Sequence, residues 1–400
     1  MNWSGAVSKL KTIAGIAHGS RAFGGPVQAS LMLTNRCNIR CIHCYFYSPL
    51  IDQSNLGPLR RTRKTLAERP PAEATAQAQQ LHADPSMIRR VLDELLQLGT
   101  RRFQFSGNGE VFLHESSLEL MRRAKQAGAY CLANTNGTLL LPRLADELLA
   151  MRFDELRVTV MGGTAEMYSR THSESGSETF NRVRDNLLYF SEKKKAKGCR
   201  RPRIILVDIV ADQNCDGLVD FAEFCVRVGA DGALFKPVDD LNDPSMFRLV
   251  PTVEHAALVR KQLGEVRVRL EAHEIRHNVD RFLAVFGRKL DTAELYRRIP
   301  CYYGWLSSMI EPDGTVYPCC RCYEAMGNVC RTSFTEIWNS ERYRQYREQA
   351  GRINRLQRPP ENCDCGSCVH HEANFRVYKA LHPLRSREVS RALPDALMSR

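Results

Sequence analysis

Apolar and polar positions over the first 240 residues predict strands and helices that alternate along the chain. Gln28 to Thr34 is a short apolar run of the kind that forms a buried strand. Asp84 and Pro85 mark the start of a helix, with Asp84 as its N-cap and Pro85 in its first turn. Apolar residues at helical spacing follow between Met87 and Leu98, and Gly99 ends the helix.

The same alternation continues beyond Gly99. The pattern predicts strands at Arg102–Ser106, Ala129–Ala133, Leu156–Met161, Arg203–Ala211 and Gly232–Pro237, separated by helices at Glu115–Gln126, Pro142–Met151, Phe180–Lys195 and Leu218–Val228. Together with the first strand they make six βα units, and this order favours parallel strands. Because parallel barrels carry their functional residues at the C-terminal ends of the strands, we expect the site there.

The remaining segments differ in composition from this alternating part. Residues 49 to 85 are a polar insertion rich in Arg, Ala and Gln, which we expect to be mobile or partly helical, or to act as a lid. The predicted organisation is a lead-in at 1–25, a core barrel at 26–240 that contains the insertion, a helical bridge at 241–298, a cysteine-rich unit at 299–378 and a loosely held basic tail at 379–400.

Composition places the chain among ordinary globular proteins. Its 400 residues are 43% hydrophobic, and no apolar run is long enough to cross a membrane. The N-terminus has no apolar stretch before a cleavage site and does not resemble a secretory signal. Fifteen cysteines in such a chain predict reduced thiols and metal ligation, and the cytoplasm as the compartment.

The net charge of +12 permits an acidic substrate or partner. Basic runs lie at residues 60–64 and 193–197 and near the C-terminus, and such runs usually form solvated faces. No aromatic-rich platform for single strands accompanies them, so we do not expect a nucleic acid as a partner. Because no apolar run is long enough to span a bilayer, we do not expect a membrane as a partner either.

Cys37, Cys41 and Cys44 place three thiols within eight residues, spaced C-x3-C-x2-C. Three thiolates can hold three corners of a cubic [4Fe–4S] cluster, which leaves the fourth iron without a protein ligand. An open metal position is where chemistry occurs, as in catalytic zinc sites. Two other interpretations stay open, a zinc knuckle with His43 as fourth ligand and three unrelated thiols.

This motif, followed by the aromatic Tyr45, resembles the radical SAM superfamily. In that family the open iron chelates the amino and carboxylate groups of S-adenosylmethionine (SAM), and reduction cleaves SAM to a radical that takes a hydrogen atom from the substrate. The resemblance implies a partial (βα)6 barrel, a [4Fe–4S] cluster with SAM as cofactors, and an external reductant such as flavodoxin or ferredoxin.

Ser106 to Glu110 (SGNGE) follows the second predicted strand and resembles the Gly-Gly-Glu-Pro segment that receives the SAM amino group in this family. The glycines let the backbone approach a ligand, and Glu110 adds an acceptor. The resemblance implies cofactor binding by Gly107, Asn108, Gly109 and Glu110. The match departs where Asn108 separates the glycines and Val111 replaces proline, and a plain strand-to-helix turn fits the segment as well.

The resemblance implies four more cofactor-binding residues near later strand ends. Asn136 lies in a turn after the third strand, and Thr159 lies on the fourth strand near the expected ribose or carboxylate. Arg170 is the candidate partner of the SAM carboxylate, although an exposed helix arginine explains it equally well. Asn214 ends the fifth strand, where polar groups commonly meet the cofactor.

The cysteine-rich unit contains a second set of thiols. Cys301 precedes Cys319, and Cys365-Gly-Ser-Cys368 follows, while Asp313-Gly314 is a hairpin signal. Two thiol pairs complete an iron–sulfur ligand set, and tetrahedral zinc is the rival occupant. The segment resembles the SPASM or shortened twitch domain, which implies one auxiliary [4Fe–4S] cluster on these four cysteines.

The other cysteines have less specific explanations. Cys131 and Cys225 lie in predicted elements and are expected to be buried apolar side chains. Cys215, at a strand end, is a candidate hydrogen donor to a substrate radical. Cys320, Cys322, Cys330 and Cys363 fit a second auxiliary cluster, spare thiols or a hydrogen donor.

These features together predict a radical SAM oxidoreductase that oxidises a carbohydrate-like or other small biosynthetic substrate. No cobalamin-binding region or extra domain for a leader peptide is evident in the sequence, which tilts the prediction away from peptides. A radical epimerase or a peptide-modifying maturase remains the alternative. An iron–sulfur or zinc scaffold that binds an acidic partner is the non-enzymatic one. The sequence does not identify a catalytic side chain that touches the substrate.

Overall fold

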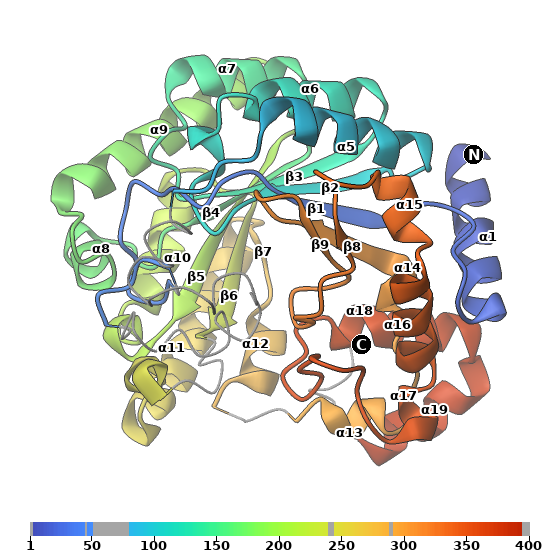
Figure 1. Cartoon of the computed structure of the whole chain (residues 1–400). Helices are drawn as coiled ribbons and strands as arrows, with labels where there is room; N and C mark the ends of the chain where they lie inside the picture. The colour runs from blue at the N-terminus through green and yellow to red at the C-terminus, as the bar shows by residue number, and fades with distance from the viewer. Residues whose placement is uncertain (1–2, 45, 51–79, 239–243, 288–290, 394–400) are drawn as a thin grey trace.

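The computed structural model describes residues 3–44, 46–50, 80–238, 244–287 and 291–393 (Figure 1). The predicted insertion therefore lies mostly outside the described residues, which resume at Gln80. Within the described ranges the strands form one sheet in the order β10-β9-β8-β1-β2-β3-β4-β5-β6-β7. The strands are β1 Gln28–Met32, β2 Arg102–Ser106, β3 Tyr130–Thr135, β4 Glu155–Thr159, β5 Arg203–Val210, β6 Gly232–Pro237, β7 Arg276–His277, β8 Ser307–Ile310, β9 Thr315–Tyr317 and β10 Gly327–Asn328.

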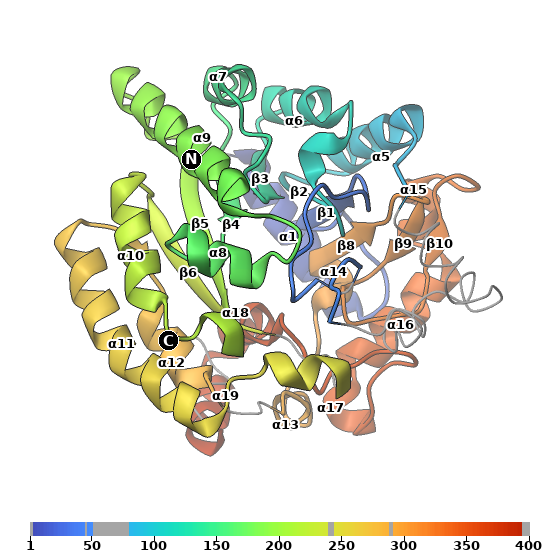
Figure 2. The ribbon, with the colours of Figure 1, turned by 90° about the vertical axis from the view of Figure 1, so that its left-hand side faces the viewer.

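Helices connect these strands and lie along the outer side of the curved sheet (Figures 1 and 2). The helices are α1 Trp3–His18, α5 Pro85–Gln97, α6 Ser117–Gln126, α7 Pro142–Ala150, α8 Ala165–Thr171, α9 Ser177–Ala196, α10 Leu218–Arg227, α11 Val253–Ala272, α12 Val279–Val285, α13 Ala293–Tyr296, α14 Tyr303–Leu306, α15 Phe334–Trp338, α16 Glu341–Gly351, α17 Ile353–Leu356, α18 His371–Leu381 and α19 Pro383–Ala392. None of the described helices is long and apolar enough to cross a membrane.

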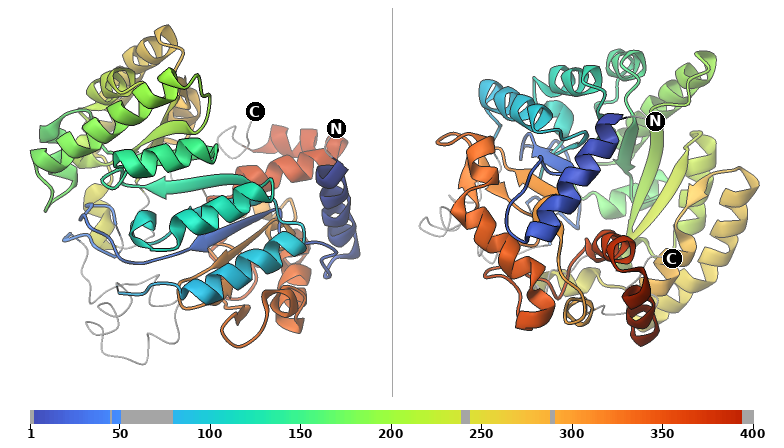
Figure 3. Two further views of the ribbon diagram at one scale, coloured as in Figure 1. Left: turned by 90° about the horizontal axis from the view of Figure 1, so that it is seen from above. Right: turned by 90° about the vertical axis from the view of Figure 1, so that its right-hand side faces the viewer.

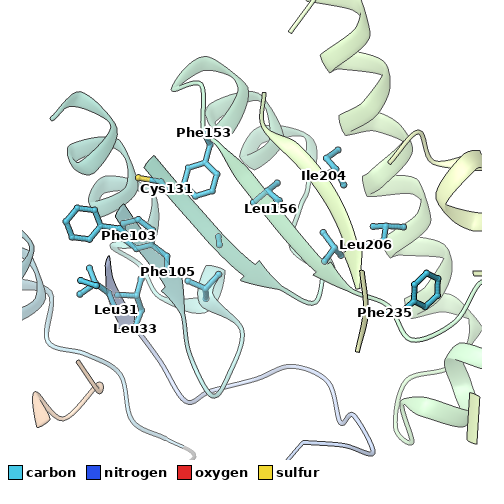
Figure 4. Packing of buried hydrophobic residues seen from close by; sticks show 14 of the residues in the cluster. Leu31, Leu33, Phe103, Phe105, Cys131, Phe153, Leu156, Ile204, Leu206 and Phe235 are labelled. Carbon is cyan, nitrogen blue, oxygen red and sulfur yellow. The ribbon is translucent and has the colours of Figure 1, made fainter. Parts of the chain in front are cut away.

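Strands β1 to β6 are parallel neighbours, as the alternating pattern predicted. Alternate residues along these strands point toward the helices and are buried there, as Figure 4 shows for Leu31, Phe103 and Leu156. The predicted helix start is confirmed, since the Asp84 side chain accepts a hydrogen bond from the Met87 backbone N–H at 2.8 Å.

The cysteine-rich unit joins the same sheet. Strand β8 pairs in parallel with β1, with Gln28 opposite Ser307 and Leu31 opposite Ile310. The predicted turn at Gly314 has φ +83° and connects β8 to the antiparallel β9. The chain therefore extends the barrel sheet sideways with a hairpin from the second thiol-bearing region.

Three parts of the structure differ from the sequence prediction. Helix α8 precedes the long helix α9, and the bridge, although mainly helical as predicted, contributes β7 as a further parallel strand beside β6. Within the predicted tail, Pro383–Ala392 forms helix α19 and is not loosely held, because Ser386, Val389 and Leu393 are buried, while residues 394–400 lie outside the described residues.

Candidate active site

The three cysteines of the first motif lie on one loop that begins where β1 ends. The Cys44 backbone N–H donates to the Cys41 carbonyl at 3.1 Å, and this turn brings the thiols together. Burial raises the pKa of Cys41 well above its usual value, and the charges of Cys44 and Cys37 raise it further. Burial likewise raises the pKa of Cys44 to about 11. These charge effects indicate that the three thiols lie near one another on the loop.

Aromatic side chains form a dry wall beside these thiols. Phe46 and Tyr47 are buried and pack against Cys37 and Cys44. The Tyr47 hydroxyl donates to the Asn35 carbonyl at 2.8 Å, and the Arg40 guanidinium lies over the Tyr47 ring. Such partial exclusion of water would affect the reduction potential of an iron–sulfur cluster held here, since solvent exposure is one of the factors that set it.

The two glycines after β2 are required by the cysteine loop itself. A side chain at Gly107 would place its Cβ 2.0 Å from the Thr34 carbonyl oxygen, and one at Gly109 would place it 1.9 Å from that of Arg36. The Glu110 backbone N–H donates to the Arg36 carbonyl at 2.8 Å, and Asn108 donates from its side chain to Asn35. This segment therefore fixes the entry to the cysteine loop.

Glu110 connects the end of β2 to the end of β3. Its buried carboxylate accepts hydrogen bonds at 2.7 Å from both the Thr135 hydroxyl and the Asn136 backbone N–H. Burial raises its pKa to about 7, against these hydrogen bonds. The Asn136 side chain in turn donates to Asn38 at 2.9 Å and to Cys37 Sγ at 3.8 Å. Glu110 and Asn136 thus hold one side of the thiol loop.

Three buried polar atoms at the loop have no hydrogen-bond partner among the residues that the structure describes: His43 Nδ1, Tyr168 Oη and His172 Nε2. The Tyr168 and His172 rings stack with centroids 3.9 Å apart. Burial raises the pKa of Tyr168, and the charges of Cys41 and Cys37 raise it further. Burial also lowers the pKa of His43, and the charge of His172 adds to this effect. Buried polar atoms without partners are costly, so we expect water or a polar ligand to bind to them.

The loop is also tied to the segment after α8. The Ile42 backbone N–H donates to the Thr171 carbonyl at 3.0 Å, and Cys41 and His172 form an antiparallel bridge. Sequence reasoning named His43 only as a possible zinc ligand and missed His172. The missed signal was the short helix α8, which ends at Thr171 next to this histidine.

The three other predicted cofactor residues lie at the ends of β4 and β5 and on α8. Thr159 is the half-buried last residue of β4. The Arg170 guanidinium pairs with Asp216 at 2.7 Å and donates to the Gln213 carbonyl, so in the structure it anchors the loop after β5. The buried Asn214 side chain donates to Asp208 at 2.8 Å and accepts from the Ala211 backbone N–H.

Asp208 gives the fold a titratable group that can be tested. Burial raises the pKa of this carboxyl to about 7, although its hydrogen bond from Asn214 lowers it. The folded state thus favours the protonated form of Asp208. Below about pH 4 the carboxyl is protonated in both the folded and the unfolded state, and its contribution to the stability of the fold is complete. As the pH rises to about 7 the unfolded state loses the proton more readily than the folded state does, and the stability falls. Between these limits, the unfolding free energy of the wild type should fall by up to about 4 kcal/mol relative to Asp208→Asn. Urea denaturation across this pH range measures it, and parallel pH profiles for the two proteins would contradict it.

Lys236 places a positive charge inside the sheet near the same loop. Its pKa is lowered to about 8 by burial and then by the Arg157 charge, and its own charge helps to lower the pKa of His43. The side chain is exposed to solvent near the C-terminal end of β6. Arg157 donates to Glu155 at 2.8 Å from the adjacent part of the sheet.

The second thiol set also comes together, although its members are far apart in the sequence. Burial raises the pKa of Cys301 well above its usual value, followed by the charges of Cys365 and Cys368. The pKa of Cys319 is raised by burial and by the charges of Cys320, Cys368 and Cys301. These mutual effects indicate that the four predicted ligands, of which Cys301 is buried and the others are half-buried, lie near one another.

Neighbouring side chains fix the two ends of this set. The Tyr296 hydroxyl lies 3.2 Å from Cys368 Sγ. The Thr292 hydroxyl donates to the Cys365 carbonyl at 2.6 Å and accepts from the Cys368 backbone N–H at 2.9 Å. Asn374 donates to the Pro300 carbonyl at 2.8 Å, beside Cys301.

Several of the remaining cysteines have defined surroundings. Cys322 and Cys363 are joined by a disulfide, which departs at this pair from the predicted reduced thiols; the other thirteen cysteines, all within the described residues, are not in disulfides. The bond forms because the chain around Cys322 pairs with the chain around Cys363. Cys320 Sγ lies 3.2 Å from His370 Nε2. Cys131 and Cys225 are fully buried, as predicted, and Cys215 is buried in the main core.

Both thiol sets fit iron–sulfur clusters in the chemistry of their donors, since each offers three or four clustered thiols within a largely dry environment. Among the described residues, no three Cys, His or carboxylate side chains have the arrangement of a single metal-ion site. A parallel sheet with three such thiols on the loop after its first strand has the features of an iron–sulfur protein.

Comparison with known protein families supports the conclusion that this is an iron–sulfur protein. Residues 31–221 match the model of the radical SAM superfamily, and residues 301–369 match that of SPASM, an iron–sulfur cluster-binding domain. The chain therefore belongs to the radical SAM superfamily and carries a SPASM domain. Its cofactors are a [4Fe–4S] cluster and SAM in the first region and auxiliary iron–sulfur clusters in the second.

Curated relatives are similar over most of the chain. The antilisterial bacteriocin subtilosin biosynthesis protein AlbA of Bacillus subtilis is 24% identical, over 90% of this chain and 71% of its own. The tungsten-containing aldehyde ferredoxin oxidoreductase cofactor-modifying protein of Pyrococcus furiosus is 22% identical, over 79% and 82%. The mycofactocin maturase MftC of Mycolicibacterium smegmatis is 23% identical, over 88% and 78%.

Among solved structures, SuiB of Streptococcus suis bound to the precursor peptide SuiA superimposes with a TM-score of 0.58. The superposition covers 85% of this chain and 70% of SuiB, at 12% identity. At this identity the likeness concerns the fold, which is that of a radical SAM protein with its C-terminal extension.

Proposed function

We propose that this radical SAM enzyme oxidises a peptide by removing hydrogen from one of its C–H bonds. The names of the relatives support the substrate class, since AlbA belongs to bacteriocin biosynthesis and MftC is a maturase. SuiB, which shares the fold, was solved with a precursor peptide. These names favour a peptide over the carbohydrate predicted from the sequence. That prediction depended only on finding no cobalamin-binding region and no domain for a leader peptide.

A small biosynthetic substrate is the second candidate. The relative from Pyrococcus furiosus is named for modifying a cofactor, and it matches this chain over a similar length. Both candidates use the same site and the same first chemical step, so they differ only in what enters the barrel.

The residues of this chain bind and position the cofactor. Cys37, Cys41 and Cys44 would ligate the cluster, while Glu110 and Asn136 hold the loop in place. When bound, the cluster and SAM supply a 5′-deoxyadenosyl radical that takes a hydrogen atom from a substrate C–H bond. We assign the three unpartnered atoms of His43, Tyr168 and His172 to hydrogen bonds with SAM, which has polar groups to match them.

In this proposal two pairs of residues that the sequence assigned to cofactor binding have a structural role. Gly107 and Gly109 serve the approach of the cysteine loop, and Arg170 and Asn214 serve the loop after β5. Thr159, at the end of β4, and Asn136 remain proposed cofactor neighbours. Lys236 adds a positive charge that favours an anionic group inside the barrel.

We propose oxidation because the chain offers four cysteines that suit an electron-accepting cluster. Only single cysteines are candidates for donating hydrogen to a substrate radical. Cys301, Cys319, Cys365 and Cys368 would hold one auxiliary cluster able to accept the second electron. Among the candidate hydrogen donors, Cys215 is buried in the core and Cys322 is engaged in a disulfide. A one-electron reductant such as flavodoxin or ferredoxin would start each turnover.

The test is anaerobic reconstitution with iron, sulfide, SAM and dithionite, followed by assays for 5′-deoxyadenosine with peptides encoded by neighbouring genes. A peptide product two hydrogens lighter, with one SAM consumed per turnover, is expected. Turnover in deuterated water provides the decisive control. Deuterium at an inverted carbon, lost when Cys320 is changed to alanine, would replace oxidation by epimerisation.

A further inference from the structure

Helix α1 turns its apolar side away from the protein. Its exposed residues include Val7, Leu10 and Ile13, whose exposed fractions are 49%, 66% and 47%. With about 100° of rotation per residue, these three lie within one arc of about 120° together with exposed alanines. We call this arc the α1 stripe, made of Ala6, Val7, Leu10, Ile13, Ala14 and Ala17.

The opposite side of α1 is fixed against the protein. A side chain at Gly15 would place its Cβ 2.9 Å from both Trp305 Cδ1 and the Arg21 carbonyl oxygen. Ile16 packs against the main core, and the Trp305 indole donates to the Arg21 carbonyl at 3.1 Å. Rolling the helix to bury the α1 stripe would break this close fit, so the stripe is exposed because of the fold itself.

The charged side chains of α1 and of the segment that follows it are all basic. Residues 1–27 contain Lys9, Lys11 and Arg21 and no Asp or Glu, and the two lysines border the stripe on its two sides. The right panel of Figure 3 shows α1 and α19 on the same side of the molecule. Helix α19 carries three exposed arginines and one glutamate on its surface: Arg385, Arg387, Arg391 and Glu388.

We propose that this side of the protein docks on an anionic lipid bilayer through the α1 stripe. Apolar residues bordered by lysines are typical of helices that lie in the membrane interface, with the apolar side about 5–10 Å below the headgroups. The basic residues of α1 and α19 would then meet the lipid phosphates. The proposal goes beyond the proposed reaction and changes the sequence prediction that the protein has no membrane partner.

The charges favour a bilayer over a second copy of the chain. In a twofold dimer formed through the α1 stripe, the same surface of each copy would face the other. The lysines that border one stripe would then lie against those of its partner, and like charges repel. An anionic surface instead pairs with every one of these lysines.

Vesicle co-sedimentation tests the proposal with the reconstituted full chain. The probes are phosphatidylcholine vesicles with and without phosphatidylglycerol. The double variant Leu10→Glu/Ile13→Glu should lower partitioning onto the anionic vesicles about tenfold or more, because it removes apolar contact and adds negative charge. Val268→Glu is the matched control, since Val268 is 67% exposed on α11, at the other side of the molecule (Figure 1).

The outcomes separate the possible occupants. Binding to anionic vesicles that weakens with salt and is lost in the double variant, with unchanged 5′-deoxyadenosine formation, supports the proposal. Failure of the wild type to sediment with either vesicle overturns it. A dimer in sedimentation velocity that the double variant dissociates, without vesicle binding, would assign the α1 stripe to a second copy.

Discussion

Replacing Cys37, Cys41 or Cys44 with alanine is expected to abolish the formation of 5′-deoxyadenosine. Each change leaves one iron of the cluster without its protein ligand, and the cluster that must be reduced is then lost. The effect should exceed the 10–100-fold loss typical of a residue that only supports a ligand. Asn136→Ala provides that smaller reference, because Asn136 contacts Cys37 Sγ without being a proposed ligand.

The matched control is Cys199→Ala, which removes a half-buried thiol that belongs to neither set. It should retain full activity and full iron content. Iron content, the absorption of the cluster and 5′-deoxyadenosine are measured on the same anaerobic preparations. Reductive cleavage of SAM by the triple alanine variant would refute the assignment of the first thiol set.

The triple variant at Cys37, Cys41 and Cys44 should still contain about four irons per chain, held by the SPASM region. The reason is that Cys301, Cys319, Cys365 and Cys368 form their own buried set, with Tyr296 and Thr292 fixing one side. Removing Cys301 and Cys319 from the triple variant should therefore lower the iron content to near zero.

Metal analysis of the triple variant distinguishes the other possibilities. Zinc without iron would show that the second set is a zinc site. About eight irons would require a second auxiliary cluster, which would recruit Cys320 and Cys330 and open the disulfide between Cys322 and Cys363. Thiol counting before and after reduction measures the state of that disulfide independently.

Local sequence patterns predict many of the strands and helices of this structure. The strand bounds Arg102–Ser106 and Gly232–Pro237 were predicted to the residue, because apolar runs and turn residues are local signals. The thiol loop was identified for the same reason, since Cys37, Cys41 and Cys44 are only a few residues apart. The helix start at Asp84 follows from its own side chain.

What the sequence did not predict depends on contacts between distant segments. The role of Gly109 follows from the carbonyl of Arg36, which reaches it only when β1 and β2 are paired. Glu110 and Asn136 meet because the register of β2 against β3 brings their strand ends together. The partner of Arg170 is Asp216, on a different loop, and no spacing rule predicts that pair.

The pairing of β1 with β8 has a consequence for how the protein is made. During synthesis, β1 leaves the ribosome early, while the strand that covers its free edge is nearly the last of the sheet to be made. At about 5–20 residues per second, that edge waits for roughly 15–60 s. An uncovered edge strand is a template for pairing with other chains. The hairpin of the SPASM region therefore also acts as the cap that ends this exposure, and a fragment that stops before Ser307 should aggregate although it contains the whole thiol loop.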